Sequence, residues 1–150
     1  MKEKFVPTRT AQTAWTGTLQ EGGGVVALTS SGVASFDVSF PRRAADNAEG
    51  VTSPEELIAA AHSACYAMAL SAEVASGGGM PRDLDVRADV SLGPDPAGGF
   101  RLTGIVLTVR GSVDGLDEAG FVAAAQRAKE GCPVSKALTG VEVSLDAALA

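Results

Sequence analysis

The segment TSPEELIAAAHSACYAMALSAE, residues 52–73, has the features of one long helix. Ser53 followed by Pro54 is typical of a helix N-cap with proline at the first helical position. Glu56 completes an S-x-x-E capping box with Ser53. This leaves Glu55 without an assigned role inside the helix, so it is either an acid favoured by the helix dipole or a residue with another role. Three consecutive glycines end the pattern. The sequence therefore predicts a helix from Pro54 to about Ala75, roughly 33 Å long at 1.5 Å per residue.

This helix is apolar on nearly every side and rich in alanine. Its uncharged run, residues 57–71, is shorter than a bilayer span, so we expect a buried core helix. A helix that is apolar all round must be buried all round, and a chain of 150 residues has few elements to cover it. The sequence therefore predicts that a second copy of the chain packs against this helix, as a two-fold dimer.

The rest of the chain shows short alternating segments and two further helical patterns. Strands are expected at residues 11–20, 21–32, 33–40, 84–92, 100–113 and 140–149, a polar loop at 41–51, and helices at 117–131 and 132–138. The first three strands form a predicted antiparallel meander, and the slip at Gly104 predicts a bulge. This order favours an α+β fold with antiparallel sheets around a long central helix, as one domain over residues 1–150 with a loose tail at 1–9.

The charge and the cysteine count limit the classes of function. A net charge of −6 argues against nucleic acid and against an anionic membrane surface as partners. No apolar run follows the first basic residues, so we expect no signal peptide and a cytoplasmic protein. Two cysteines in a reducing compartment are expected as thiols rather than as a structural disulfide.

The two cysteines have opposite local settings. Cys65 lies in the middle of the apolar helix, where it is either a small buried hydrophobe or a reactive thiol that needs a cation from elsewhere. Cys132 comes directly before Pro133 at the start of a short helix, where backbone amides favour a thiolate. Local chemistry thus predicts Cys132 as the more acidic thiol, and a plain turn residue is the alternative. Such a pair suits peroxide reduction, in which one sulfur becomes a sulfenic acid and the other condenses with it.

His62 precedes Cys65 by three residues and so lies on the same helix face. It is either a general base or a hydrogen-bonded core residue. His62, Cys65 and Cys132 could in principle ligate a metal. The chain has no other histidine or cysteine and no C-x-x-C motif, so we expect no metal.

The segments SPEELIAAAHSACYAMAL (53–70) and GCPVSKAL (131–138) resemble the OsmC/Ohr family of osmotically inducible and organic hydroperoxide resistance proteins, closer to its OsmC branch. The resemblance continues from WTG at 15–17 through DVRADVSL at 85–92 to VEVSLD at 141–146. It implies an intertwined α+β homodimer with active sites at the interface. It also implies a thiol-dependent peroxidase that reduces organic hydroperoxides, and hydrogen peroxide less well, to alcohols without a cofactor, using an external dithiol.

The same resemblance implies roles for individual residues. Cys65 corresponds to the peroxidatic cysteine and Cys132 to the resolving one. An arginine in the loop before the long helix would stabilise the thiolate. Arg43 fits this role better than Arg42, which we interpret as a solvated residue at a strand end. Glu55 corresponds to the glutamate that holds this arginine.

Helix geometry limits how Glu55 can act. It lies ten positions before Cys65, which is about 15 Å along one helix, so the two side chains cannot meet directly. Either Arg43 spans the gap or the glutamate near a given sulfur belongs to the partner subunit. Two other functions remain open: a cysteine-based redox sensor or stress-binding protein with little turnover, and a family member whose degraded site only carries a hydrophobic ligand.

Overall fold

The computed structural model describes residues 6–150. They form two compact units, one ending at Pro54 and the other spanning Glu55–Ala150. Of the predicted loose tail, residues 1–5 lie outside the described part, and residues 6–9 are exposed and belong to no helix or strand. That residues 1–150 act as a single domain stays a prediction.

The first unit is built on a three-stranded antiparallel sheet, which confirms the predicted meander. Its strands are β1 (Gln12–Thr16), β2 (Gly23–Ala27) and β3 (Ser35–Val38), in the order β1-β2-β3. The prediction of a loop at 41–51 is wrong at its start, because residues Phe40–Arg43 form the short helix α1. The Ser39 hydroxyl caps this helix by accepting from the Arg42 amide, and Pro41 stands in its first turn.

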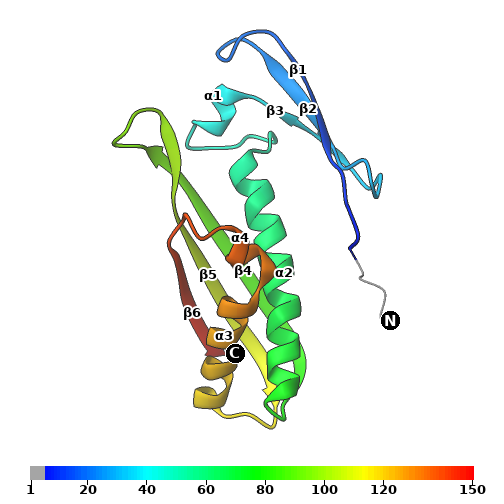
Figure 1. Cartoon of the computed structure of the whole chain (residues 1–150), viewed down its shortest axis with the longest axis vertical. Coiled ribbons are helices and arrows are strands. Elements are labelled where there is room, and N and C mark those ends of the chain that lie inside the picture. Colours follow the sequence, from blue (N-terminus) through cyan, green and yellow to red (C-terminus); the bar gives the residue numbers. More distant parts are fainter. Residues whose placement is uncertain (1–5) are drawn as a thin grey trace. The chain divides into compact units, whose positions relative to one another are not determined.

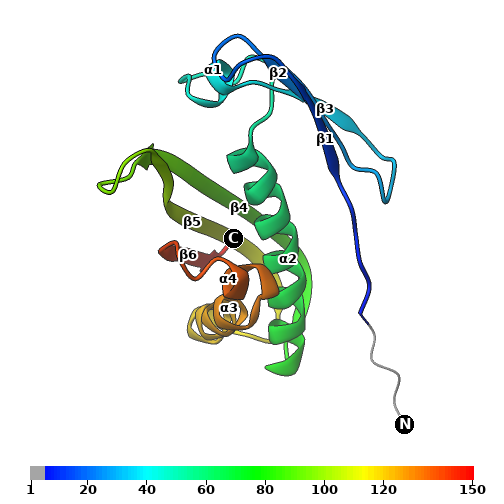
Figure 2. The same cartoon turned by 45° about the horizontal axis from the view of Figure 1, so that its top comes forward.

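The second unit packs helices on one face of a second sheet (Figures 1 and 2). Its elements are the helices α2 (Pro54–Ser76), α3 (Glu118–Gly131) and α4 (Pro133–Ala137) and the strands β4 (Met80–Pro94), β5 (Phe100–Asp114) and β6 (Val143–Leu149). The central strand β5 contributes Ile105, Leu107 and Val109 to a wholly buried core, with side chains of α2 and α3 on the other side. The boundaries of α2 confirm the helix expected between the Ser-Pro start and the glycines.

The second sheet is mixed rather than antiparallel. β4 and β5 pair antiparallel as predicted, and Ser91 pairs with Gly104 while Leu92 pairs with Leu102, so the expected bulge includes Thr103. The prediction of antiparallel pairing is wrong for β6, which is parallel to β5. The reason is the crossover through α3 and α4, which returns the chain to the end of β5 from which a parallel strand must start.

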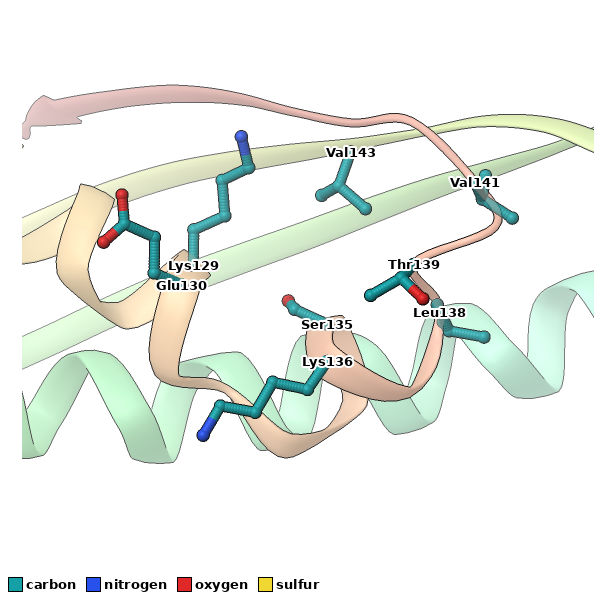
Figure 3. A pocket seen from close by; sticks show the side chains of 8 residues that line it. All are labelled: Lys129, Glu130, Ser135, Lys136, Leu138, Thr139, Val141 and Val143. Carbon is teal, nitrogen blue, oxygen red and sulfur yellow. The ribbon is translucent and has the colours of Figure 1, made fainter.

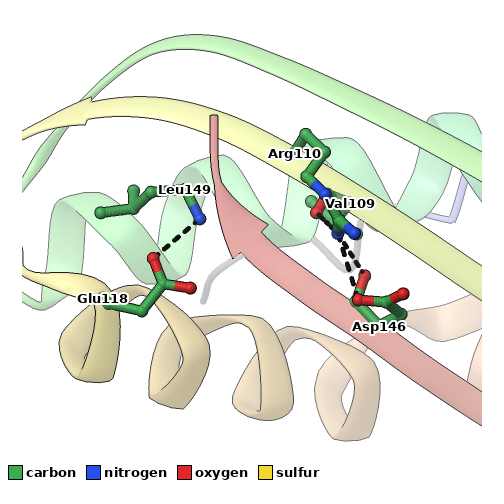
Figure 4. A network of polar contacts seen from close by, with 5 residues as sticks. All are labelled: Val109, Arg110, Glu118, Asp146 and Leu149. Carbon is green, nitrogen blue, oxygen red and sulfur yellow. Dashed lines mark hydrogen bonds and ion pairs between the residues drawn. The ribbon is translucent and has the colours of Figure 1, made fainter.

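Polar contacts hold β6 in place at the edge of this sheet (Figure 4). Arg110 of β5 donates to the carboxylate of Asp146 at 3.2 Å. The carboxylate of Glu118 at the start of α3 accepts from the Leu149 amide at 3.0 Å. One contact thus joins β6 to β5 and the other joins the end of β6 to the start of α3.

Helix α2 is covered on one face only within the chain. His62, Tyr66, Leu70 and Val74 follow a spacing of four residues and are wholly buried. Met68 on another face is 75% exposed. This exposure agrees with the expectation that one chain has too few elements to cover the helix, and the second copy expected to cover the rest stays a prediction.

The prediction that the apolar segment is too short to span a bilayer is wrong as far as length is concerned. α2 has 23 residues and is long and apolar enough to cross a membrane by length and composition alone. The core helix of a soluble protein passes the same test, and the buried row of α2 packs in the core with β5 and α3.

A close approach between β5 and α3 gives a stability prediction. A Cβ added at Gly111 would lie 2.7 Å from the ring of Phe121, which is itself wholly buried. We expect Gly111→Ala to lower the free energy of unfolding by about 1–3 kcal/mol, because the packed ring has no room to move away. Gly131→Ala is the control, since nothing lies within 4 Å of its added Cβ. Denaturant unfolding in which both variants matched the parent protein would contradict the argument.

Candidate active site

The structure brings the two cysteines together although 67 positions separate them in the chain. Cys65 comes from the middle of α2, and Cys132 lies at the junction where α3 ends and α4 begins. Both are free, and their Sγ atoms lie 3.3 Å apart in a hydrogen-bonded contact. Cys132 is wholly buried, whereas Cys65 is half-buried. A disulfide needs a sulfur–sulfur distance near 2.05 Å, so a movement of about 1.3 Å would join them.

Cys132 is the more acidic of the two thiols, as its position before a short helix predicted. Burial acts to raise the pKa of Cys132. The Ser135 amide, the Cys65 thiol, the Ser135 hydroxyl and the Val134 amide outweigh burial, so that the pKa of Cys132 is lowered below its ordinary value. Donors directed at the sulfur thus replace the water that burial removes.

Cys65 shows the opposite shift. Burial raises the pKa of Cys65, the Val134 amide acts to lower it, and the hydrogen bond and charge of the neighbouring Cys132 raise it again, so the net shift is upward. Either thiol can donate a hydrogen bond to the other sulfur across this short contact. When only one of the two is ionised, Cys132 is the thiolate because its pKa is lower, and the Cys65 thiol is the donor. The second unit alone therefore does not activate Cys65, which is consistent with the predicted need for a cation from elsewhere.

His62 is a hydrogen-bonded residue of the core. Its ring is wholly buried, and Nε2 lies 2.7 Å from the hydroxyl of Ser135. Nδ1 has no hydrogen-bond partner among the described residues. Burial lowers the pKa of His62, so the ring is neutral near pH 7.

Ser135 was not among the candidates from the sequence, yet its hydroxyl lies 2.7 Å from Nε2 of His62 and contributes to lowering the pKa of Cys132. Its one signal in the sequence is its place in the first turn of the helix that Cys132 starts, where its amide and hydroxyl can turn toward the preceding residue. Ser135 also lines a pocket of about 330 Å³ next to α4 (Figure 3). The other lining residues are Lys129, Glu130, Lys136, Leu138, Thr139, Val141 and Val143.

Tyr66 joins α2 to α3 beside the sulfurs. Its hydroxyl donates to the carbonyl oxygen of Ala125 at 2.8 Å, and the side chain is wholly buried. Burial, with a smaller contribution from the charge of Cys132, raises the pKa of Tyr66, so it stays a neutral donor. This bond fixes the helix that carries Cys65 against the helix that leads to Cys132.

The structure places the remaining predicted residues one by one. Glu55 is 7% exposed in the first turn of α2. Arg43 is the last residue of α1, half-buried in the first unit. Arg42 lies in α1 rather than at a strand end and pairs with Glu49 at 2.9 Å, and the choice of Arg43 over Arg42 stays a prediction. Contacts of Arg43 with Glu55 or with Cys65 stay predictions.

The metal hypothesis finds no support in the arrangement. Across residues 6–150, no group of three or more histidine, cysteine, aspartate or glutamate side chains is placed to hold a metal ion. His62 instead binds Ser135, and Cys132 binds Cys65.

The fold and these two sulfurs define a class: α+β proteins in which a helix cysteine faces a second free thiol from a crossover connection. The sequence model of the family described as OsmC-like protein matches residues 46–146. The chain is 41% identical over 135 residues to peroxiredoxin OsmC of Escherichia coli, covering 90% of this chain and 92% of that protein. It is 32% identical over 121 residues to the organic hydroperoxide resistance protein of Xanthomonas axonopodis pv. citri, covering 79% and 82%.

The solved structures agree with these relatives. The crystal structure of an organic hydroperoxide resistance protein OsmC from Legionella pneumophila superposes with a TM-score of 0.77 at 30% identity, covering 97% of this chain and 99% of that one. The chain belongs to the OsmC-like protein family. The resemblance seen in the two cysteine segments and the α+β fold that it implied are therefore confirmed.

Proposed function

We propose that the protein is a cysteine-based peroxidase that reduces organic hydroperoxides, and hydrogen peroxide less well, to alcohols. The observation that carries the proposal is the 3.3 Å separation between the free sulfurs of Cys65 and Cys132. The names of the relatives, peroxiredoxin and organic hydroperoxide resistance protein, support a role in peroxide reduction.

The proposed cycle uses the two sulfurs in turn. The Cys65 thiolate attacks the outer peroxide oxygen, the O–O bond breaks, and the alkoxide leaves as alcohol after taking a proton. Cys132 then attacks the sulfur of the Cys65 sulfenic acid, which forms a disulfide and releases water. An external dithiol reduces the disulfide and becomes oxidised itself. These steps need no metal, haem or flavin.

Activation of Cys65 is the part of the proposal that draws on the resemblance. Arg43 would lower the pKa of the Cys65 thiol by its charge and stabilise the departing oxygen, and Glu55 would hold Arg43 in place. The proposed enzyme is a homodimer with its sites at the interface. The uncovered face of α2 around Met68 supports a second copy there, and the 15 Å between Glu55 and Cys65 along one helix supports a contribution from the partner subunit. Reactive thiols of this kind fit a cytoplasmic location.

Turnover separates this enzyme from a redox sensor with the same disulfide. With an excess of dithiol, we expect each chain to consume hundreds of molecules of cumene hydroperoxide, and Cys65 to be oxidised faster by this reagent than by hydrogen peroxide. The apolar surroundings of the sulfurs are the reason for that preference. Oxidation that stops at one equivalent per chain would contradict the enzyme and favour the sensor.

A further inference from the structure

A row of hydrogen-bonding atoms runs from α2 through α4 to both sulfurs. Nε2 of His62 lies 2.7 Å from the hydroxyl oxygen of Ser135. Ser135 stands in the first turn of the helix that Cys132 starts, and its hydroxyl acts to lower the pKa of Cys132, whose sulfur lies 3.3 Å from that of Cys65. His62 and Cys132 are wholly buried, whereas Ser135 is half-buried and lines the pocket next to α4. The proposed cycle uses the two sulfurs and leaves His62 and Ser135 without a role.

The number of available protons determines which atom donates and which accepts in each hydrogen bond between His62, Ser135 and Cys132. A serine hydroxyl has one proton, and when it is donated to the Cys132 sulfur, the oxygen must accept from His62. Nε2 of the neutral ring therefore carries the proton, and Nδ1 carries the lone pair that has no partner among the described residues. In the other tautomer, Nε2 would draw the hydroxyl proton away from the sulfur and leave a buried N–H at Nδ1 without an acceptor. Only the first tautomer leaves the Ser135 hydroxyl free to donate its proton to Cys132.

We propose that His62 and Ser135 are positioning residues that hold Cys132 as the thiolate which resolves the Cys65 sulfenic acid. This inference rests on the proposed peroxidase function and deepens it. Ser135 donates directly to the sulfur, and His62 acts through Ser135 by orienting its hydroxyl.

The resolving step then balances without any further reagent. The Cys132 thiolate forms the S–S bond to Cys65, and the S–O bond of the sulfenic acid breaks with its electron pair. The departing hydroxide takes up a proton from solvent and leaves as water, while the Ser135 hydroxyl keeps its proton and loses the thiolate as its acceptor. The thiolate is the attacking species in such exchanges, so a donor that favours it speeds the step.

Other charged and titratable groups around Cys132 are few. The helix α2 contributes Cys65, whose pKa is raised by the contacts within the second unit, and Tyr66, which stays a neutral donor. The pocket that Ser135 lines brings further charged groups to its wall: Lys129, Glu130 and Lys136. Ser135 thus shares the pocket wall with these charged side chains.

The first experiment titrates Cys132 alone, in Cys65→Ser protein, by the ultraviolet absorbance of its thiolate. We expect Ser135→Ala to raise the midpoint by about one pH unit, a roughly ten-fold loss of thiolate, and Ser135→Thr to restore it because the hydroxyl is retained. Ser63→Ala is the matched control, since the Ser63 hydroxyl bonds only to the Ala60 carbonyl on the same helix. This titration needs no peroxide, so it decides on Ser135 even if the proposed function fails.

The second experiment compares two amides at position 62. In His62→Gln the side-chain amide can place an N–H donor where Nε2 of the histidine lies. In His62→Asn the shorter side chain can place its polar atoms only where Nδ1 lies. We expect the Gln variant to keep most of the acidity of Cys132 and the Asn variant to lose it. In protein that retains Cys65, disulfide formation after one equivalent of hydroperoxide should slow more than Cys65 oxidation in Ser135→Ala and His62→Asn. An unchanged midpoint in Ser135→Ala, or equal behaviour of the two amides, would overturn the proposal.

Discussion

Cys65→Ser protein should consume organic hydroperoxide no faster than the buffer does. A serine hydroxyl at this position cannot be oxidised to a sulfenic acid, and Cys132 is wholly buried, so the hydroperoxide finds no reactive sulfur it can reach. The measurement is the loss of cumene hydroperoxide with dithiol in excess. Ala69→Ser is a matched control, because it adds a hydroxyl to the same helix beside the core and leaves both sulfurs in place.

The reversed assignment of the two cysteines would give the opposite result. Local chemistry makes Cys132 the more acidic thiol, so an arrangement in which Cys132 attacks the peroxide and Cys65 resolves it is chemically complete. In that case Cys65→Ser would still release one equivalent of alcohol, and Cys132→Ser would release none. Observing that pattern would reverse the roles proposed for the two cysteines.

Cys132→Ser protein should release one equivalent of alcohol per chain and then stall. Cys65 would still attack the hydroperoxide, but its sulfenic acid would face a hydroxyl in place of the sulfur that lies 3.3 Å away in the parent protein. The measurements are the alcohol released per chain and the capture of the sulfenic acid by a carbon nucleophile such as dimedone. The parent protein should give a disulfide and no captured product under the same conditions. Sustained cycling by the variant would refute the resolving role of Cys132.

The long helix and its flanking strands could be predicted because local signals mark their ends. The Ser53-Pro54 start and the glycines that follow Ser76 bound α2 from the sequence alone. The direction of β6 could not be predicted, because the alternation of a strand is the same in parallel and antiparallel pairing. The short helix α1 was missed because four residues are too few to show a helical period.

Several residues of the site could be predicted from the sequence, but the contacts between them could not. Both cysteines stood out by type and position, yet nothing in a spacing of 67 residues shows that they meet. Ser135 was missed for the same reason, since its partner His62 lies 73 positions away and serine is common at a helix start. The roles of Arg43 and Glu55 stay predictions, because Arg43 belongs to the unit before α2 and no contact within either unit tests that pairing.

The unequal exposure of the two sulfurs has a consequence for how the proposed disulfide is reopened. A reductant arriving from solvent meets Cys65, the half-exposed sulfur, while Cys132 is wholly buried behind it. The incoming thiolate would therefore form a mixed disulfide with Cys65, and Cys132 would be the leaving group. Leaving groups with a low pKa depart faster, so the donors that acidify Cys132 would favour its release as well as its attack. The same few hydrogen bonds would then speed both halves of the redox cycle, with the buried sulfur moving little in either.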